Sequence, residues 1–146
     1  MLGEVLDMKN SRYFNVSRSE NVITAEIVDS YLSGGTMSEL IRLELAKILE
    51  LSPEILIIDF RNVKLIGTGT IDGFLQIIRR TAIGKTQLMF CCMSDSLRAV
   101  FKTLNLDGTV FKIYETAQEA LAAKRFTYHE VVGEAYSPDE EPEGLA

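Results

Sequence analysis

The chain opens with alternating apolar and polar positions and then changes to a helical spacing. Tyr13–Arg18 and Val22–Val28 both alternate, and Ser19-Glu20-Asn21 joins them, which predicts an antiparallel hairpin. After a break at Ser33-Gly34-Gly35, apolar residues recur every three or four positions until Ser52-Pro53, where a helix must end. The apolar positions of this predicted helix are Met37, Leu40, Ile41, Leu45, Ile48 and Leu49.

Three strands without alternation follow. Glu54–Phe60 carries an unbroken apolar run, which is typical of a strand covered on both faces, and Gln87–Met93 has the same character. Val110–Tyr114 is predicted as the last strand.

Helical patterns separate and follow these strands. The first has inward positions at Ile71, Phe74, Leu75 and Ile78; we expect it to end at Arg79-Arg80, with Gly84 closing it. Ser94 or Asp95 is predicted to cap the second. Its expected inward positions are Leu97, Val100, Phe101 and Leu104. A capping box, Thr116-Ala117-Gln118-Glu119, opens a short helix through Ala123.

Strands separated by helices indicate an α/β fold with a mostly parallel sheet, which the N-terminal antiparallel hairpin makes mixed. About four helices are expected to cover it. We expect one domain over residues 1–125 and a disordered tail over residues 126–146, which is rich in Pro, Gly and acids. The N-terminus shows no secretion signal, so a cytoplasmic location is expected.

The charge of the chain lies in that tail. Residues 1–125 hold all 15 Lys and Arg and, since six of the 21 acids lie beyond Arg125, 15 acids as well. The tail therefore supplies the whole net charge of -6. A neutral body with an acidic tail does not suit nucleic acid or an anionic membrane, and we expect neither as a partner.

The residues that usually build catalytic or metal sites are scarce. Cys91 and Cys92 are adjacent in an apolar run, and His129 is the only histidine. Neighbours on a strand point to opposite faces, so we expect two small buried hydrophobes with no disulfide between them. We expect no metal, no cofactor and no enzymatic activity.

The segment Gly67–Gly73 is the one candidate for ligand chemistry. It lies between a strand and a helix, where backbone N–H groups and the helix dipole favour anions. Gly67, Gly69 and Gly73, with Asp95 after the next strand, partly match a dinucleotide fingerprint. However, Arg61–Ile66 separates the glycines from the strand, and no second half follows. A small nucleotide-binding sensor is therefore kept as an alternative.

From Phe14 to Arg125 the chain resembles the STAS domain of bacterial anti-sigma-factor antagonists, stressosome proteins and sulfate-transporter tails. The resemblance rests on Ile55–Phe60, Val63–Leu75, Gln87–Met93 with Ser94–Leu106, and Val110–Tyr114. Members usually carry an Asp-Ser/Thr stretch where this chain has Gly67-Thr68-Gly69-Thr70.

The resemblance implies partner switching. In such proteins a kinase that is also an anti-sigma factor phosphorylates a Ser or Thr at this helix start, and a phosphatase reverses the change. The acceptor position of stressosome-type members falls on Thr68 and that of sporulation-type members on Gly69. Thr68 is therefore the first candidate, Thr70 is a second candidate or an N-cap, and no modification at all is the third option. The expected partner-binding residues are Ser33, Ser38, Lys64, Gly67, Gly69, Gln76, Arg79 and Arg80. A stressosome scaffold and a regulatory subunit of a transporter ATPase are alternatives, and a homodimer is left open.

Overall fold

The hairpin forms where the alternation predicts it. In the computed structural model, which describes residues 4–5 and 12–123 with the side chains of residues 4, 5, 82 and 83 left out, β2 (Phe14–Ser19) and β3 (Val22–Ile27) pair antiparallel. Ser19 lies opposite Val22, so the turn contains only Glu20 and Asn21. Glu20 has φ of 57°, the left-handed conformation that so short a turn requires.

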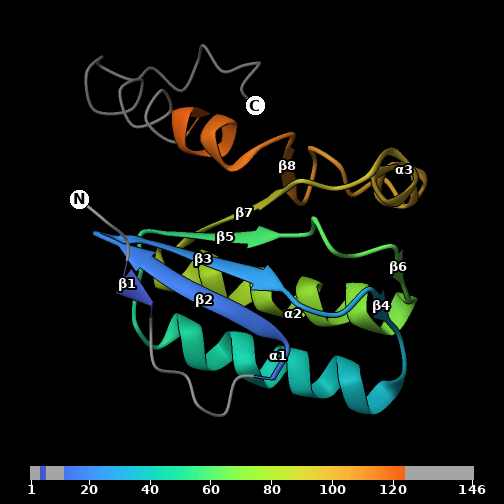
Figure 1. The fold of residues 1–146 in the computed structure, drawn as a ribbon, viewed down its shortest axis with the longest axis horizontal. Coiled ribbons are helices and arrows are strands. Elements are labelled where there is room, and N and C mark those ends of the chain that lie inside the picture. The colour runs from blue at the N-terminus through green and yellow to red at the C-terminus, as the bar shows by residue number, and fades with distance from the viewer. Residues whose placement is uncertain (1–3, 6–11, 124–146) are drawn as a thin grey trace.

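The sheet is mixed and mostly parallel, as expected. Its strand order is β1-β2-β3-β5-β7-β8 (Figure 1), with β3, β5, β7 and β8 parallel and β1 antiparallel to β2. The further strands of this sheet are β1 (Glu4–Val5), β5 (Ile55–Asp59), β7 (Gln87–Cys91) and β8 (Lys112–Tyr114). Every residue of β5 is buried, which fits its unbroken apolar run.

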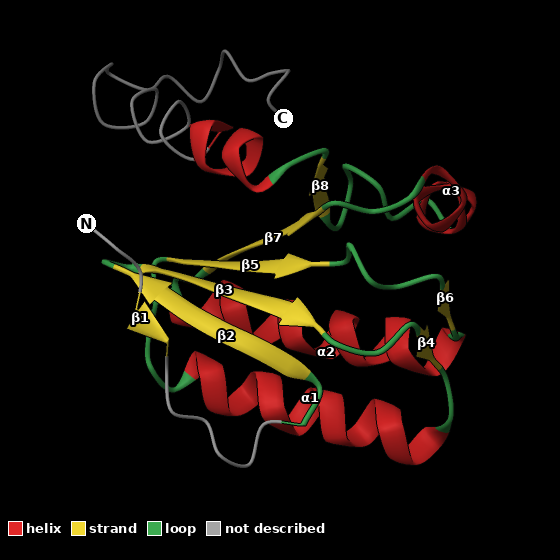
Figure 2. Ribbon diagram, in the orientation of Figure 1, coloured by secondary structure: helices red, strands yellow, loops and turns green. Residues whose placement is uncertain are grey.

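Helices cover both faces of the sheet (Figure 2). Helices α1 (Gly35–Leu49) and α2 (Thr68–Gly84) lie side by side on one face, and helical residues 117–123 lie on the other. Alternate residues of β5 therefore enter different cores: Leu56 joins the large cluster with α1 and α2, whereas Ile57 joins a small one with Ala120. With α3 (Asp95–Thr103), four helical segments are described, which confirms the expected fold class.

The large core is centred on five phenylalanines, each at most 1% exposed. They come from different elements, and the rings of Phe90 and Phe111 stack with centroids 4.6 Å apart. The five are Phe60, Phe74, Phe90, Phe101 and Phe111. Their ring contacts join the ends of β5 and β7 to α2 and α3 in one core.

Two predicted caps form. The Ser94 hydroxyl accepts a hydrogen bond from the Leu97 amide (3.1 Å) at the start of α3. The Thr116 hydroxyl accepts one from the Glu119 amide (3.0 Å). The sequence therefore placed both helix starts correctly.

Several details differ from the predictions. Helix α2 continues past Arg79-Arg80 and ends at Gly84, and Lys85 takes the left-handed backbone (φ 71°) instead of a glycine. Leu40, Val100 and Leu104 are exposed, because α1 and α3 contact the core through a narrower stripe than their apolar positions suggest. Residues 126–146 and His129 lie outside the described residues.

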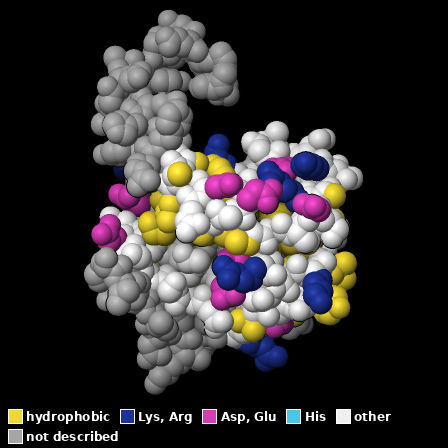
Figure 3. Space-filling view, turned by 45° about the horizontal axis from the view of Figure 1, so that its top comes forward, with side chains coloured by type: hydrophobic (Ala, Val, Ile, Leu, Met, Phe, Trp, Pro, Cys, Tyr) yellow, Lys and Arg dark blue, Asp and Glu magenta, His cyan; other side chains and the backbone are white. Residues whose placement is uncertain are grey.

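The surface charge and the described helices bear on what this protein can contact. Acidic and basic side chains are interspersed on the face that Figure 3 shows, in agreement with the balanced charge of residues 1–125. Among the described helices, none combines the length and the apolar character that crossing a membrane requires.

Candidate functional site

Two loops that lie far apart in the sequence are joined directly before α1 and α2. The short strands β4 (Tyr31–Leu32) and β6 (Leu65–Ile66) pair in parallel. The amide of Gly67 donates to the carbonyl of Leu32 at 2.6 Å, which continues the pairing to the first turn of α2. The sequence did not predict this pairing, which holds the start of α2 in a fixed place beside α1.

The two candidate threonines lie in opposite environments. Thr68 is the first residue of α2 and is exposed. Thr70 is 1% exposed, and its hydroxyl lies 2.9 Å from Oγ of Ser38 and 3.3 Å from the carbonyl oxygen of Leu32. The N-cap of α2 is Gly67, so the interpretation of Thr70 as an N-cap is wrong. Only Thr68 presents its hydroxyl to solvent.

The glycines near the start of α2 face α1 and the segment that precedes α1. A Cβ on Gly69 would lie 3.3 Å from Oγ of Ser38, and one on Gly73 would lie 3.7 Å from the Ser38 carbonyl oxygen. A Cβ on Gly67 would lie 3.3 Å from Cβ of Ser33. Gly67 and Gly69 therefore let the start of α2 lie close to Ser33 and Ser38, whereas a Cβ at Gly73 would make only an ordinary contact with α1.

The structure divides the remaining predicted contact residues into two groups. Ser33 and Lys64 are exposed beside Thr68, whereas Ser38 is half-buried and donates to the Gly34 carbonyl (2.9 Å) while contacting Thr70. Gln76, Arg79 and Arg80 are exposed farther along α2, where they line a groove against α1.

Two exposed apolar residues of the β4–β6 pair were not named among the predicted contact residues. Tyr31 and Leu65 are 61% and 55% exposed and lie opposite each other in the β4–β6 pair. Val28, which is 43% exposed, lies three residues before Tyr31 on the same loop. A single apolar residue in a loop gives no periodic signal, and only the pairing of two distant loops shows that these side chains are neighbours.

The cysteines correct a second expectation. Strand β7 ends at Cys91, and Cys92 has φ of 66°, so the two Sγ atoms lie 3.4 Å apart instead of pointing to opposite faces. Both cysteines are free, and a carboxylate oxygen of Asp59 lies within 4.8 Å of both sulfurs, a trio of donor atoms that adjacency in the sequence did not suggest.

Asp59 and the two thiols differ in their surroundings. The Asp59 carboxylate accepts three hydrogen bonds from Arg61, two from its guanidinium and one from its amide, and the guanidinium bonds raise the pKa of Arg61. Burial raises the pKa of both thiols.

Comparison with known proteins identifies the class. The STAS domain model matches residues 5–120, and the chain belongs to the STAS domain family. None of the curated proteins compared with the chain matches it.

Solved structures share the fold. An anti-sigma factor antagonist from Mycobacterium paratuberculosis has TM-score 0.68 and 19% identity over 82% of this chain and 99% of its own. RsbS from Moorella thermoacetica has TM-score 0.67 and 11% identity over 82% and 99%. The anti-sigma factor antagonist SpoIIAA, solved in its unphosphorylated form, has TM-score 0.63 and 16% identity over 77% and 96%. At these identities the likeness concerns the fold.

Proposed function

We propose that this chain is a protein-interaction module without catalytic activity, an anti-sigma-factor antagonist that binds a serine/threonine-kinase anti-sigma factor. Phosphorylation of Thr68 releases this partner, and a phosphatase restores binding. The observation that carries the proposal is the exposure of Thr68 at the first position of α2, while Thr70 is buried. In support, SpoIIAA of Bacillus, a protein of the same fold, has been solved in a phosphorylated form as well.

The location suits a reversible charge. The N-terminus of a helix carries a partial positive charge, so the fold tolerates a phosphate on Thr68. The same phosphate adds nearly two negative charges to a surface that meets a partner as a neutral hydroxyl. Asp72, one turn along α2, repels this phosphate and offsets a part of the stabilisation by the helix N-terminus. Modification therefore acts on docking while leaving the fold intact.

The apolar pair Tyr31 and Leu65, on the strands that lead into α1 and α2, supplies the binding energy in this proposal. Tyr31 and Leu65 are exposed on neighbouring strands whose positions the β4–β6 bonds fix, so ordering them on binding costs little entropy. Large apolar side chains at the centre of an interface usually carry most of its affinity. Lys64 and Ser33 provide a polar rim around them.

The test is phosphorylation by a kinase-type anti-sigma factor encoded near this chain, with ATP, followed by intact-mass measurement. We expect a mass gain of one phosphate in the natural chain and in Thr70→Val, and no gain in Thr68→Ala. Thr70→Val is the matched control because it keeps the shape of the buried side chain. A phosphate retained in Thr68→Ala, or lost in a folded Thr70→Val, contradicts the assignment.

A constitutive scaffold is the second candidate. One protein of this fold comes from the stressosome and another is a sulfate transporter family protein from Wolinella succinogenes, and the exposed Tyr31 and Leu65 suit permanent docking equally well. Stable binding to a partner, with no phosphate gained from any kinase-type anti-sigma factor of the same genome, favours this candidate.

A further inference from the structure

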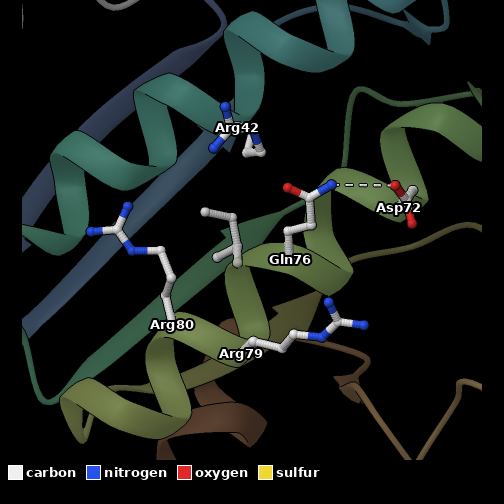
Figure 4. A pocket seen from close by; sticks show the side chains of 6 residues that line it. Arg42, Asp72, Gln76, Arg79 and Arg80 are labelled. Carbon is white, nitrogen blue, oxygen red and sulfur yellow. Dashed lines mark hydrogen bonds between the residues drawn. The ribbon is translucent and has the colours of Figure 1, made fainter.

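A groove between α1 and α2 gathers three arginines (Figure 4). It has a volume of about 430 Å³ and lies between the central turns of α1 and the middle and C-terminal turns of α2. Its lining residues are Arg42, Asp72, Gln76, Ile77, Arg79 and Arg80. Neither Thr68 nor the β4–β6 residues Tyr31 and Leu65 line it, so this groove is separate from the site at the start of α2.

Two of the three arginines of the groove have no acidic partner among the described residues. Arg42 forms an ion pair with Glu39 (2.5 Å), and the Asp72 carboxylate accepts a hydrogen bond from Gln76 (3.3 Å). Among the described residues, no carboxylate lies within ion-pair distance of Arg79 or Arg80, and both side chains are exposed. The groove therefore has two guanidinium groups available for an anionic occupant.

The same chain carries the complementary charge. Residues 1–125 are neutral in sum, and the net charge of -6 comes from residues 126–146. Four of those six acids stand within five positions, Asp139-Glu140-Glu141 and Glu143. A multivalent acidic segment and an unbalanced arginine groove therefore occur in one polypeptide.

The connecting chain is long enough. Residue 139 lies 16 positions beyond residue 123, the last described, and 16 residues span up to about 55 Å when extended. Helical residues 117–123 and the C-terminal half of α2 lie on opposite faces of the sheet but in the same half of the molecule, at the left of Figure 1. Two packed layers separate them by about 20 Å. The segment can reach the groove around the edge of the sheet.

We propose that the acidic segment 139–143 docks on Arg79 and Arg80 in the groove between α1 and α2 of its own chain. Each exposed ion pair contributes at most about 1 kcal/mol. Two such pairs, at Arg79 and Arg80, contribute about 2 kcal/mol, which corresponds to a dissociation constant of about 30 mM. A flexible tether provides an effective concentration in the millimolar range, so the segment occupies the groove for roughly a tenth of the time. The interaction is electrostatic and weakens as the ionic strength rises.

The test uses the full chain and no partner, so its result is independent of the proposed function. We compare the backbone amide and Arg Nε–H NMR signals of the natural chain with those of the variant D139N/E140Q/E141Q/E143Q. We expect the signals of residues 76–80 to shift, those of α3 to stay, and the difference to disappear in 0.5 M NaCl, where the Debye length is about 4 Å.

A variant pair makes the test specific. The four tail substitutions are repeated in two backgrounds. In R79Q/R80Q they should change no signal of residues 76–80. In K102Q, which removes an exposed cation from α3, they should shift the signals of residues 76–80 as much as in the natural chain. Unshifted groove signals, or shifts that persist in R79Q/R80Q, overturn the proposal. Shifts that grow with protein concentration also overturn it, because they assign the groove to the tail of a second copy.

Discussion

The outer and inner sides of the first turn of α2 carry the same residue type in opposite roles. Thr68 faces solvent, whereas Thr70 is buried against Leu32 and Ser38. Two residues along a helix correspond to a rotation of about 200°, so one threonine must face away when the other faces the packed side. The comparison indicates that the outer side is free to change its charge while the inner side holds α1 and α2 together.

The largest difference between the two sides is expected when a carboxylate is placed on each of them in turn. Thr70→Asp puts a charge beside the Leu32 carbonyl without a cation, and we expect the free energy of unfolding to fall by about 3 kcal/mol. Thr68→Asp places the same charge at the positive end of the helix, which stabilises it, while Asp72 one turn along repels it, so we expect a change below about 0.5 kcal/mol. Urea unfolding of both full-length variants measures the difference. Equal losses for the two would show that the sides are not distinct.

A second prediction separates docking from stability on the outer surface. Tyr31→Ala with Leu65→Ala removes two exposed apolar side chains, so we expect partner affinity to fall by about 2 kcal/mol, roughly thirtyfold. The free energy of unfolding should change by less than about 0.5 kcal/mol, because surface substitutions of this kind rarely matter more.

Calorimetric titration with the kinase-type anti-sigma factor measures that affinity. Leu43→Ala on α1, also an exposed leucine, is the matched control and should bind normally. Unchanged affinity of the double variant would remove Tyr31 and Leu65 from the proposed interface.

The smallest expected change in the free energy of unfolding comes from removing the buried hydroxyl of Thr70 alone. Thr70→Val keeps the shape of the side chain but removes its contacts with Ser38 and Leu32, and we expect a loss of about 1 kcal/mol. Thr68→Val should cost less than about 0.5 kcal/mol, since its hydroxyl is exposed. Thermal unfolding of the pair measures both, and a larger loss for Thr68→Val would reverse the assignment of sides.

Local pattern was enough for most elements. The run Ile55-Leu56-Ile57-Ile58 predicted a strand buried on both faces, and Ser94 predicted the start of α3, because both signals lie within a few neighbouring residues. Val100 and Leu104 show the limit of this information: they keep the helical spacing of the core positions but are exposed. Periodicity gives the apolar side of a helix, whereas the width of its contact depends on what packs there.

The candidate site was predicted less completely. The segment Gly67–Thr70 was recognised from its glycines and hydroxyls, and Thr68 was the first choice among its residues. Tyr31 and Leu65 were not recognised, and neither was the approach of Asp59 to Cys91 and Cys92. Each missed feature joins residues from separate strands or loops, for which a single sequence carries no local signal.

The sequence by itself determined the order of the hairpin, the three parallel strands after it and the helices, but not the short strands β1, β4 and β6. It also determined the neutral body with its acidic tail and the presence of hydroxyls at the start of α2. The tertiary structure decided which hydroxyl is exposed, how closely Gly67 and Gly69 approach Ser33 and Ser38, and which exposed apolar side chains the β4–β6 pair brings together. The physical reason is that periodicity and capping are local, whereas exposure depends on atoms that distant segments bring close, as Leu32 and Ser38 do to Thr70.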